Sequence, residues 1–208
     1  ENIFHLVLAR VAGSPEGVKG ISLFIVPKYW IDKDVREDRI NGVNCSAIER
    51  KMGIHGNPTC VMNFDNAQGF LVGAINKGLQ NMFTFVNESR LGVAQQAQGA
   101  IELSYQNAAN YAFERRQMRA PKSVDRSGDA DPIIEHPDVR RMLLTQKALS
   151  EGARLLNCYC AQQVDLSHSP NSETRQSALA RLALLTPIAK GFVSEVAVEA
   201  TNYGIQIF

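Results

Sequence analysis

The pattern of hydrophobic and polar residues changes near residue 75. Before this point, short apolar runs rich in β-branched and aromatic residues are separated by Gly, Pro and Asn, which predicts strands joined by turns. The predicted strands cover residues 3–11, 20–27, 44–50 and 59–65. The second of these is almost continuously apolar, and we therefore expect it to be buried on both faces.

Beyond Leu79, the apolar residues recur at steps of three and four, as they do along one face of an α-helix. This spacing predicts one helix from about residue 79 to 118, a second from Pro137 to about 166, and a third from about 173 to 203. Pro137 suits the first turn of a helix, and Pro187 predicts a kink inside the third helix. Helices of this length need partners, so we predict an up-and-down bundle. The fold class is α+β, with a short antiparallel β segment followed by a bundle of long helices.

Composition and charge narrow the class of protein. Hydrophobic residues make up 45% of the chain and charged residues 21%, which is the ordinary globular mixture. Lys and Arg number 22 against 21 Asp and Glu, giving a net charge of +1. Such a balance provides no basic footprint for nucleic acid or a membrane surface, and no apolar run approaches the roughly 20 residues that cross a bilayer. We predict no nucleic-acid partner and no membrane span.

The cysteines favour ordinary thiols over a metal site. Cys45 and Cys60 stand alone in the sequence, whereas Cys158 and Cys160 form a C-x-C pair inside a predicted helix. Residues two apart on a helix point about 200° away from each other. The C-x-x-C pairs and matching partners that zinc requires are absent, so we predict no metal ligands.

Few residues suggest chemistry by themselves, because no nucleophile motif, P-loop or dinucleotide-binding glycine motif is present. Glu88 and Glu102 fall inside the first helix, where an exposed helix face is the common role and a general base is the alternative. His136 stands at a predicted helix start, which suits capping or packing.

Arginines offer two further possibilities. Arg90 lies mid-helix among small apolar residues and needs a partner, either a carboxylate on another helix or an anionic ligand. Arg115, Arg116 and Arg119 form a cluster at the predicted end of the first helix. They could complement the helix dipole, or bind a pyrophosphate through guanidinium forks. The spacing alone leaves both possibilities open.

Several segments, taken in order along the chain, resemble the acyl-CoA dehydrogenase family. They are the strand 20–27, the loop Lys51–Thr59, the linker Gly69–Gly78, Arg90, the segment Tyr111–Gln117 and the segment Ala200–Phe208. The resemblance implies that residues 1–74 are part of a middle β domain. It also implies that residues 75–208 are three helices of a truncated C-terminal four-helix bundle domain.

The resemblance also implies a reaction. Members of the family oxidise acyl-CoA to trans-2-enoyl-CoA in fatty-acid β-oxidation. A glutamate removes the α-proton, FAD accepts the hydride, and electrons leave through electron-transferring flavoprotein. The base is expected outside this chain, because Ser89 occupies one of its two family positions and the other follows Phe208. We therefore assign no catalytic residue and expect the fragment to be inactive by itself.

Binding roles follow from the same resemblance, one position at a time. Asn87 and Arg90 match positions that contact the acyl-CoA substrate. Four positions match FAD contacts: Arg115 and Gln117 at the pyrophosphate of a neighbouring subunit, His136 near the adenosine, and Gln206 near the flavin. Met118 and Arg119 replace the aromatic residue and the glycine that are usual there.

The resemblance further implies a homo-oligomer, either a dimer or a tetramer, and we expect a cytoplasmic bacterial protein. Three alternatives stay open: an acyl-CoA oxidase-like relative, a flavoprotein associated with DNA damage, and a helical oligomerisation module without catalysis.

Overall fold

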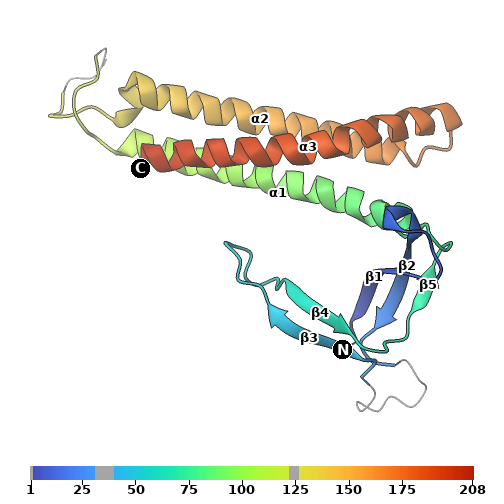
Figure 1. Ribbon diagram of the computed structural model, residues 1–208. Helices are drawn as coiled ribbons and strands as arrows, with labels where there is room; N and C mark the ends of the chain where they lie inside the picture. The colour runs from blue at the N-terminus through green and yellow to red at the C-terminus, as the bar shows by residue number, and fades with distance from the viewer. Residues whose placement is uncertain (1, 31–39, 122–126) are drawn as a thin grey trace. The chain divides into compact units, whose positions relative to one another are not determined.

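The computed structural model describes residues 2–30, 40–121 and 127–208, and the chain divides into two compact units, Glu1–Phe85 and Val86–Phe208. Figure 1 shows the β-rich first unit and the helical second unit. The predicted charged loop at 32–39 lies outside the described residues. The domain boundary placed between residues 74 and 75 stays a prediction. It falls shortly before helix α1 (Gly78–Glu114), which begins in the first unit and continues into the second.

The first unit contains two antiparallel sheets. One has the strand order β1 (Phe4–Arg10), β2 (Ile21–Pro27) and β5 (Phe70–Val72), and the other pairs β3 (Val43–Ile48) with β4 (Cys60–Phe64). All four predicted strands are confirmed. The central strand β2 has no exposed residue, in agreement with the burial expected of it. A short 3-10 helix, η1 (Gly17–Gly20), precedes β2.

Strand β5 was not predicted, because its segment resembles a linker and is only three residues long. The buried side chain of Asn41, which lies outside both strands, holds β5 beside β2. The Asn41 Nδ2 donates to the carbonyls of Pro27 and Gln68, both at 2.8 Å, and its Oδ1 accepts from the Gln68 amide at 2.9 Å. Asn41 thereby ties the end of β2 to the residues that lead into β5.

Three long helices run side by side in the second unit (Figure 1). They are α1, α2 (Pro137–Leu166) and α3 (Ser172–Ile207), with a short 3-10 helix, η2 (Ile133–Glu135), before α2. The predicted start of α2 at Pro137 is confirmed. Helix α3 begins after Asn171, whose side chain accepts from the Thr174 amide at 3.0 Å as an N-cap. Pro187 lies inside α3, and the kink remains a prediction. None of the helices, over the part of the chain described, is long and apolar enough to cross a membrane.

Small apolar residues form the core where the helices meet. On α1, fully buried residues recur at seven-residue steps, as expected of one helical face. The buried residues of this core are Ala94 and Ile101 on α1, Ala153 and Cys160 on α2, and Ala189, Val193, Val196, Ala197 and Ala200 on α3. A second cluster, which includes Ala108, Ala112 and Ile207, continues this core toward the C-terminal ends of α1 and α3.

The buried face of α2 also carries a polar stripe, which the hydrophobic pattern did not predict. Each of its members bonds to α1 or α3, which offsets part of the cost of burying polar groups, although Gln146 Nε2 and Asn157 Oδ1 have no hydrogen-bond partner among the described residues. The hydrogen bonds are Ser104 Oγ to Gln146 Oε1 at 3.1 Å, Ser150 Oγ to Glu102 Oε2 at 2.5 Å, Asn157 Nδ2 to the Ala94 carbonyl at 3.2 Å, and Arg181 Nη1 to Gln163 Oε1 at 3.5 Å.

Glu102 is not the exposed-face glutamate expected from its spacing. Its carboxylate accepts from Ser150 of α2, from Arg154 Nη2 at 2.6 Å and from Gln106 Nε2 at 2.7 Å. The hydrogen bond from Ser150, followed by those from Gln106 and the charge of Arg154, lowers the pKa of Glu102. Glu102 is therefore an ionised link between α1 and α2. Glu88, by contrast, is exposed, as predicted.

The cysteines differ from expectation at one pair. Cys45 and Cys60, distant in sequence, lie on neighbouring strands β3 and β4, and a hydrogen bond with Cys45 raises the pKa of Cys60. The helical pair is as predicted, with Cys158 exposed and Cys160 buried.

We predict that Glu102→Gln weakens folding in a pH-dependent way. Because the folded-state pKa of Glu102 is lowered, its ionised form stabilises the fold above the unfolded pKa of about 4.3, and that contribution is lost as the pH falls through the folded value. The substitution should cost about 1 kcal/mol of unfolding free energy at pH 7, since the site is partly solvated. Denaturant unfolding at pH 7 and pH 3.5 measures this. The exposed control Glu88→Gln should change little at either pH, and a cost for Glu102→Gln that does not depend on pH would contradict the ionised link.

A second prediction compares two glycines of α3. A Cβ at Gly204 would overlap the Oγ of Ser104, which bonds Gln146, whereas a Cβ at Gly191 meets nothing within 4 Å. Gly204→Ala should destabilise the chain by about 1–2 kcal/mol through overpacking. Gly191→Ala should stabilise it by up to about 1 kcal/mol through helix propensity. Thermal unfolding followed by circular dichroism checks both, and equal shifts would refute the close approach of α1 and α3 at Gly204.

Candidate functional site

Helix α1 ends at Glu114, four residues before the predicted end, and the chain then turns back on itself. The segment 115–118 pairs with 131–133 in a short antiparallel ladder. Pro132 favours this pairing, because a proline restricts the residue before it to extended backbone. The backbone bonds are Gln117 N to Asp131 O at 3.0 Å, Asp131 N to Met118 O at 2.9 Å, and Ile133 N to Arg115 O at 2.8 Å. The arginine cluster therefore begins directly after the last turn of α1 and lies in the turn that follows the helix.

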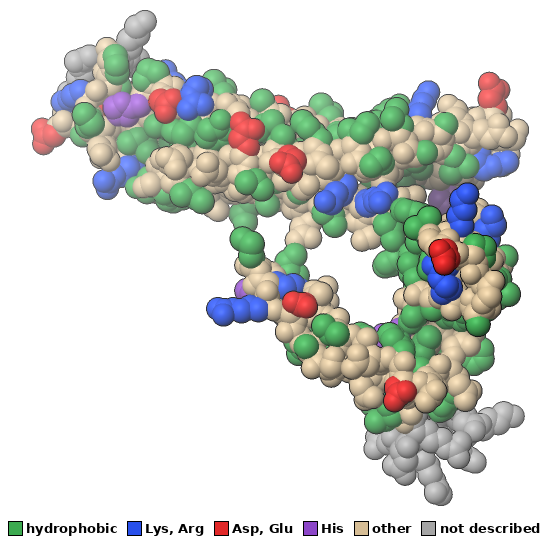
Figure 2. Space-filling view, in the orientation of Figure 1, with side chains coloured by type: hydrophobic (Ala, Val, Ile, Leu, Met, Phe, Trp, Pro, Cys, Tyr) green, Lys and Arg blue, Asp and Glu red, His purple; other side chains and the backbone are tan. Residues whose placement is uncertain are grey.

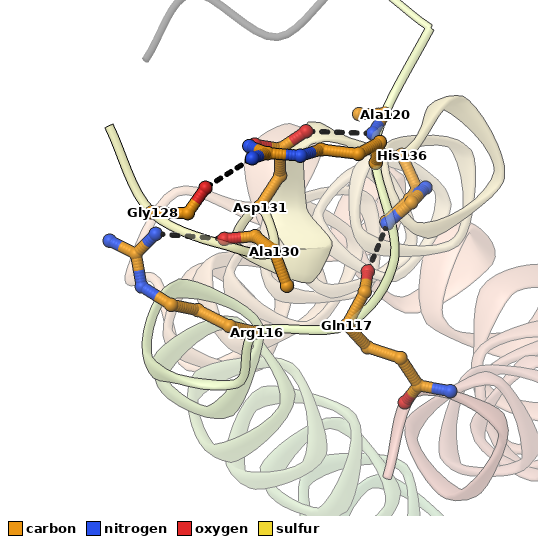
Figure 3. Close-up of polar contacts among 8 residues, drawn as sticks. Arg116, Gln117, Ala120, Gly128, Ala130, Asp131 and His136 are labelled. Atoms are coloured by element: carbon orange, nitrogen blue, oxygen red, sulfur yellow. Dashed lines mark hydrogen bonds and ion pairs between the residues drawn. The ribbon is translucent and has the colours of Figure 1, made fainter. Parts of the chain in front are cut away.

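Asp131 lies at the centre of this turn, with a side chain that is 0% exposed. Figure 3 shows its carboxylate beside Ala120, whose amide donates to Oδ2 at 2.8 Å. The other oxygen, Oδ1, forms an ion pair with Arg119 Nη1 at 3.1 Å. Both carboxylate oxygens are thus bonded to residues that follow α1.

The three arginines of the cluster have different partners. Arg116 Nη1 donates to the Ala130 carbonyl at 3.1 Å (Figure 3), and Arg119 donates to the Gly128 carbonyl as well as to Asp131. Arg115 is exposed, and its Nη2 lies 3.5 Å from Oε1 of Gln117. Arg116 and Arg119 hold the turn together, whereas the fork of Arg115 points to its neighbour Gln117, which is exposed as well.

His136 occupies the N-cap position of α2, but its side chain makes no capping hydrogen bond. Its Nε2–H instead donates to the Gln117 carbonyl at 2.8 Å, as Figure 3 shows. Of the two expected roles, capping or packing, the ring does not cap the helix, and it supports the turn instead. Three of the four residues assigned to FAD, namely Arg115, Gln117 and His136, thus lie together.

The fourth, Gln206, is an exposed residue in the last turn of α3. The end of α3 is held against α1 by Phe208, whose ring stacks on Tyr111 with centroids 4.5 Å apart. Gln206 is therefore near the C-terminal end of α1. Among the residues described, no hydrogen bond joins it to the other three.

Asn87 and Arg90 lie near the opposite end of α1. Arg90 Nη1 donates to Asn87 Oδ1 at 3.3 Å, which places the two side chains on one face. At 1.5 Å per residue, the 24 residues from Arg90 to Glu114 span about 36 Å. The residues assigned to the substrate and those assigned to the cofactor form two separate groups.

Sequence reasoning missed Asp131, the ion-pair partner of Arg119. The sequence analysis assigned no role to the segment 120–131, part of which lies outside the described residues. A signal was available: an acid directly before a proline, a short distance beyond three arginines, suggests an extended residue with a nearby cation.

Comparisons with known proteins identify the family of the chain. The family model described as "Acyl-CoA dehydrogenase, C-terminal domain" matches residues 76–208. The 3-methylmercaptopropionyl-CoA dehydrogenase of Ruegeria pomeroyi is 45% identical over 208 residues, which are 100% of this chain and 35% of that protein. A butyryl-CoA dehydrogenase of Syntrophomonas wolfei is 37% identical over 99% of the chain and 35% of its own length.

Solved structures give the same result. The butyryl-CoA dehydrogenase of Megasphaera elsdenii superposes with a TM-score of 0.74 at 25% identity, over 99% of this chain and 45% of that one. The chain spans about a third of the length of the curated relatives above, 35% in each case. From the family model and these relatives, we conclude that the chain belongs to the acyl-CoA dehydrogenase family.

Proposed function

We propose that the chain is part of a flavin-dependent acyl-CoA dehydrogenase, which oxidises acyl-CoA to trans-2-enoyl-CoA in fatty-acid β-oxidation. Family membership supports this proposal, as do two relatives named as dehydrogenases of acyl-CoA thioesters. The activity is proposed for the protein as a whole. This chain matches only 35% of the length of the Ruegeria relative.

The observation that supports the cofactor assignment is the exposed guanidinium of Arg115. Among the described residues it forms no ion pair or backbone bond such as those of Arg116 and Arg119. A guanidinium fork fits phosphate oxygens in a bidentate manner, so Arg115 suits the pyrophosphate of FAD. Gln117 adds an amide beside it, and His136 fixes the backbone of Gln117. FAD, when bound, supplies the acceptor for the hydride.

Asn87 and Arg90 are proposed to contact acyl-CoA, whose phosphates suit the charge of Arg90. The distance of about 36 Å along α1 between Arg90 and the end of the helix at Glu114 supports the involvement of a second copy of the chain. Arg115 and Gln117 would contact the FAD of a neighbouring copy, not the cofactor beside Arg90 of the same chain.

A neighbouring copy requires a homo-oligomer, which we propose to be a dimer or a tetramer. Figure 2 shows hydrophobic side chains spread over the visible surface of the helices. On α3, Leu184, Ile188 and Phe192 follow one another at four-residue steps, and each is about half exposed or more. Such an apolar stripe suits a protein interface.

The remaining partners and the location are inferred from the family assignment. We propose electron-transferring flavoprotein as the electron acceptor and the bacterial cytoplasm as the location. The bacterial relatives from Ruegeria and Syntrophomonas support a bacterial origin.

We predict that Arg115→Ala in the full-length protein loosens FAD by about one to two orders of magnitude, as expected for a bidentate charged contact. Arg115→Lys should recover only part of the affinity, since a point charge cannot reproduce the fork. Titration of the apoprotein with FAD, followed by flavin absorbance, measures both.

Arg116→Ala is the matched control. It removes an identical charge at the next residue, and the side chain of Arg116 bonds the Ala130 carbonyl. It should weaken FAD binding much less. Equal losses for Arg115→Ala and Arg116→Ala would show that the fork of Arg115 has no special part, whether the cluster acts through general charge or through the turn that Arg116 holds, and the pyrophosphate assignment would be wrong.

A further inference from the structure

We propose that Asp131 is a positioning residue for the cofactor contact: its buried carboxylate fixes the turn that presents Arg115 and Gln117. This inference rests on the proposed role of Arg115 at the FAD pyrophosphate. Asp131 itself contacts neither the reacting atoms nor the ligand. It acts through the residues that follow α1, which it holds in place.

Burial is the first argument. A carboxylate that is fully shielded from water is costly unless its oxygens are bonded. The two oxygens of Asp131 accept from different residues of the turn, the Ala120 amide at 2.8 Å and the Arg119 guanidinium at 3.1 Å. Removing the charge therefore weakens the bonds to both residues at once, and among the described residues the Arg119 side chain keeps only its bond to the Gly128 carbonyl.

The backbone of Asp131 adds two more bonds to the same turn. Its carbonyl accepts from the Gln117 amide at 3.0 Å, and its amide donates to the Met118 carbonyl at 2.9 Å. Asp131 is thus bonded to four consecutive residues, 117 to 120, through the main chain and the side chain. Met118 has a φ of 58°, in the left-handed region that non-glycine residues rarely adopt, and its conformation depends on such support.

The direction of the side chains gives the third argument. Had α1 continued through Gln117, Arg115 and Gln117 would point about 200° apart and could not address one ligand. In the turn held by Asp131, Arg115 Nη2 lies 3.5 Å from Gln117 Oε1. The turn converts two residues that a helix would separate into a pair that can bind one phosphate group.

Asp131→Asn in the full-length protein tests this. The amide keeps the size of the carboxylate but has one acceptor oxygen, so its nitrogen must face either the Ala120 amide or Arg119. We expect the dissociation constant for FAD to rise about tenfold, as for the loss of a charged hydrogen bond. We also expect faster hydrogen exchange at the Ala120 amide, with unchanged exchange at the core amides of α2. Asp129→Asn is the matched control, an exposed aspartate two residues away, and should change neither readout.

Three results would overturn the inference. If Arg115→Ala loosens FAD but Asp131→Asn does not, Asp131 does not position the contact. If Asp131→Asn lowers the unfolding temperature of the apoprotein and speeds exchange throughout α2, its role is general stability. If Arg115→Ala itself leaves FAD binding unchanged, the proposed cofactor role fails first, and the positioning role fails with it. The FAD affinity of Arg115→Ala therefore shows which proposal has failed: if it is unchanged, the cofactor role is wrong, and if it is reduced, only the role of Asp131 is in question.

Discussion

The helical unit depends on the requirement that buried polar groups on α2 find partners. On the buried face of α2, Gln146, Ser150 and Asn157 each have a defined partner on α1. A shift by one residue would leave these groups unpaired in the core, at a cost of about 1–3 kcal/mol for each. The polar stripe therefore sets the register of the helices, and the small apolar residues around it allow the close approach.

The sequence predicted most of the fold because periodicity is a local property. The four longer strands and all three helices were found from apolar spacing, and Pro137 marked the start of α2. The errors occurred where distant residues decide. Strand β5 exists because Asn41 draws Gln68 toward β2, and α1 stops at Glu114 because the following residues pair with the segment around Asp131. Neither partner is visible in a window of helical or strand length.

The candidate site was predictable to a similar degree. The resemblance selected Arg115, Gln117 and His136, and the structure places these three together. The spacing could not separate a dipole role from an anion role for the arginines, because both require only a cluster near a helix end. The guanidinium groups differ in their partners: among the described residues, those of Arg116 and Arg119 bond the turn, whereas that of Arg115 contacts only Gln117. Glu102 was misjudged for the same reason, since Ser150 and Arg154 are 48 and 52 residues away.

The pair of cysteines on α2 has a chemical consequence. Burial raises the pKa of Cys160, so this thiol stays protonated and unreactive while the helices are packed, whereas Cys158 is exposed. The two side chains point to opposite sides of α2, which prevents them from joining to each other. Oxidation of this helix would therefore begin at Cys158 and proceed to a sulfenic acid or a mixed disulfide with an outside thiol, leaving the core sulfur unchanged.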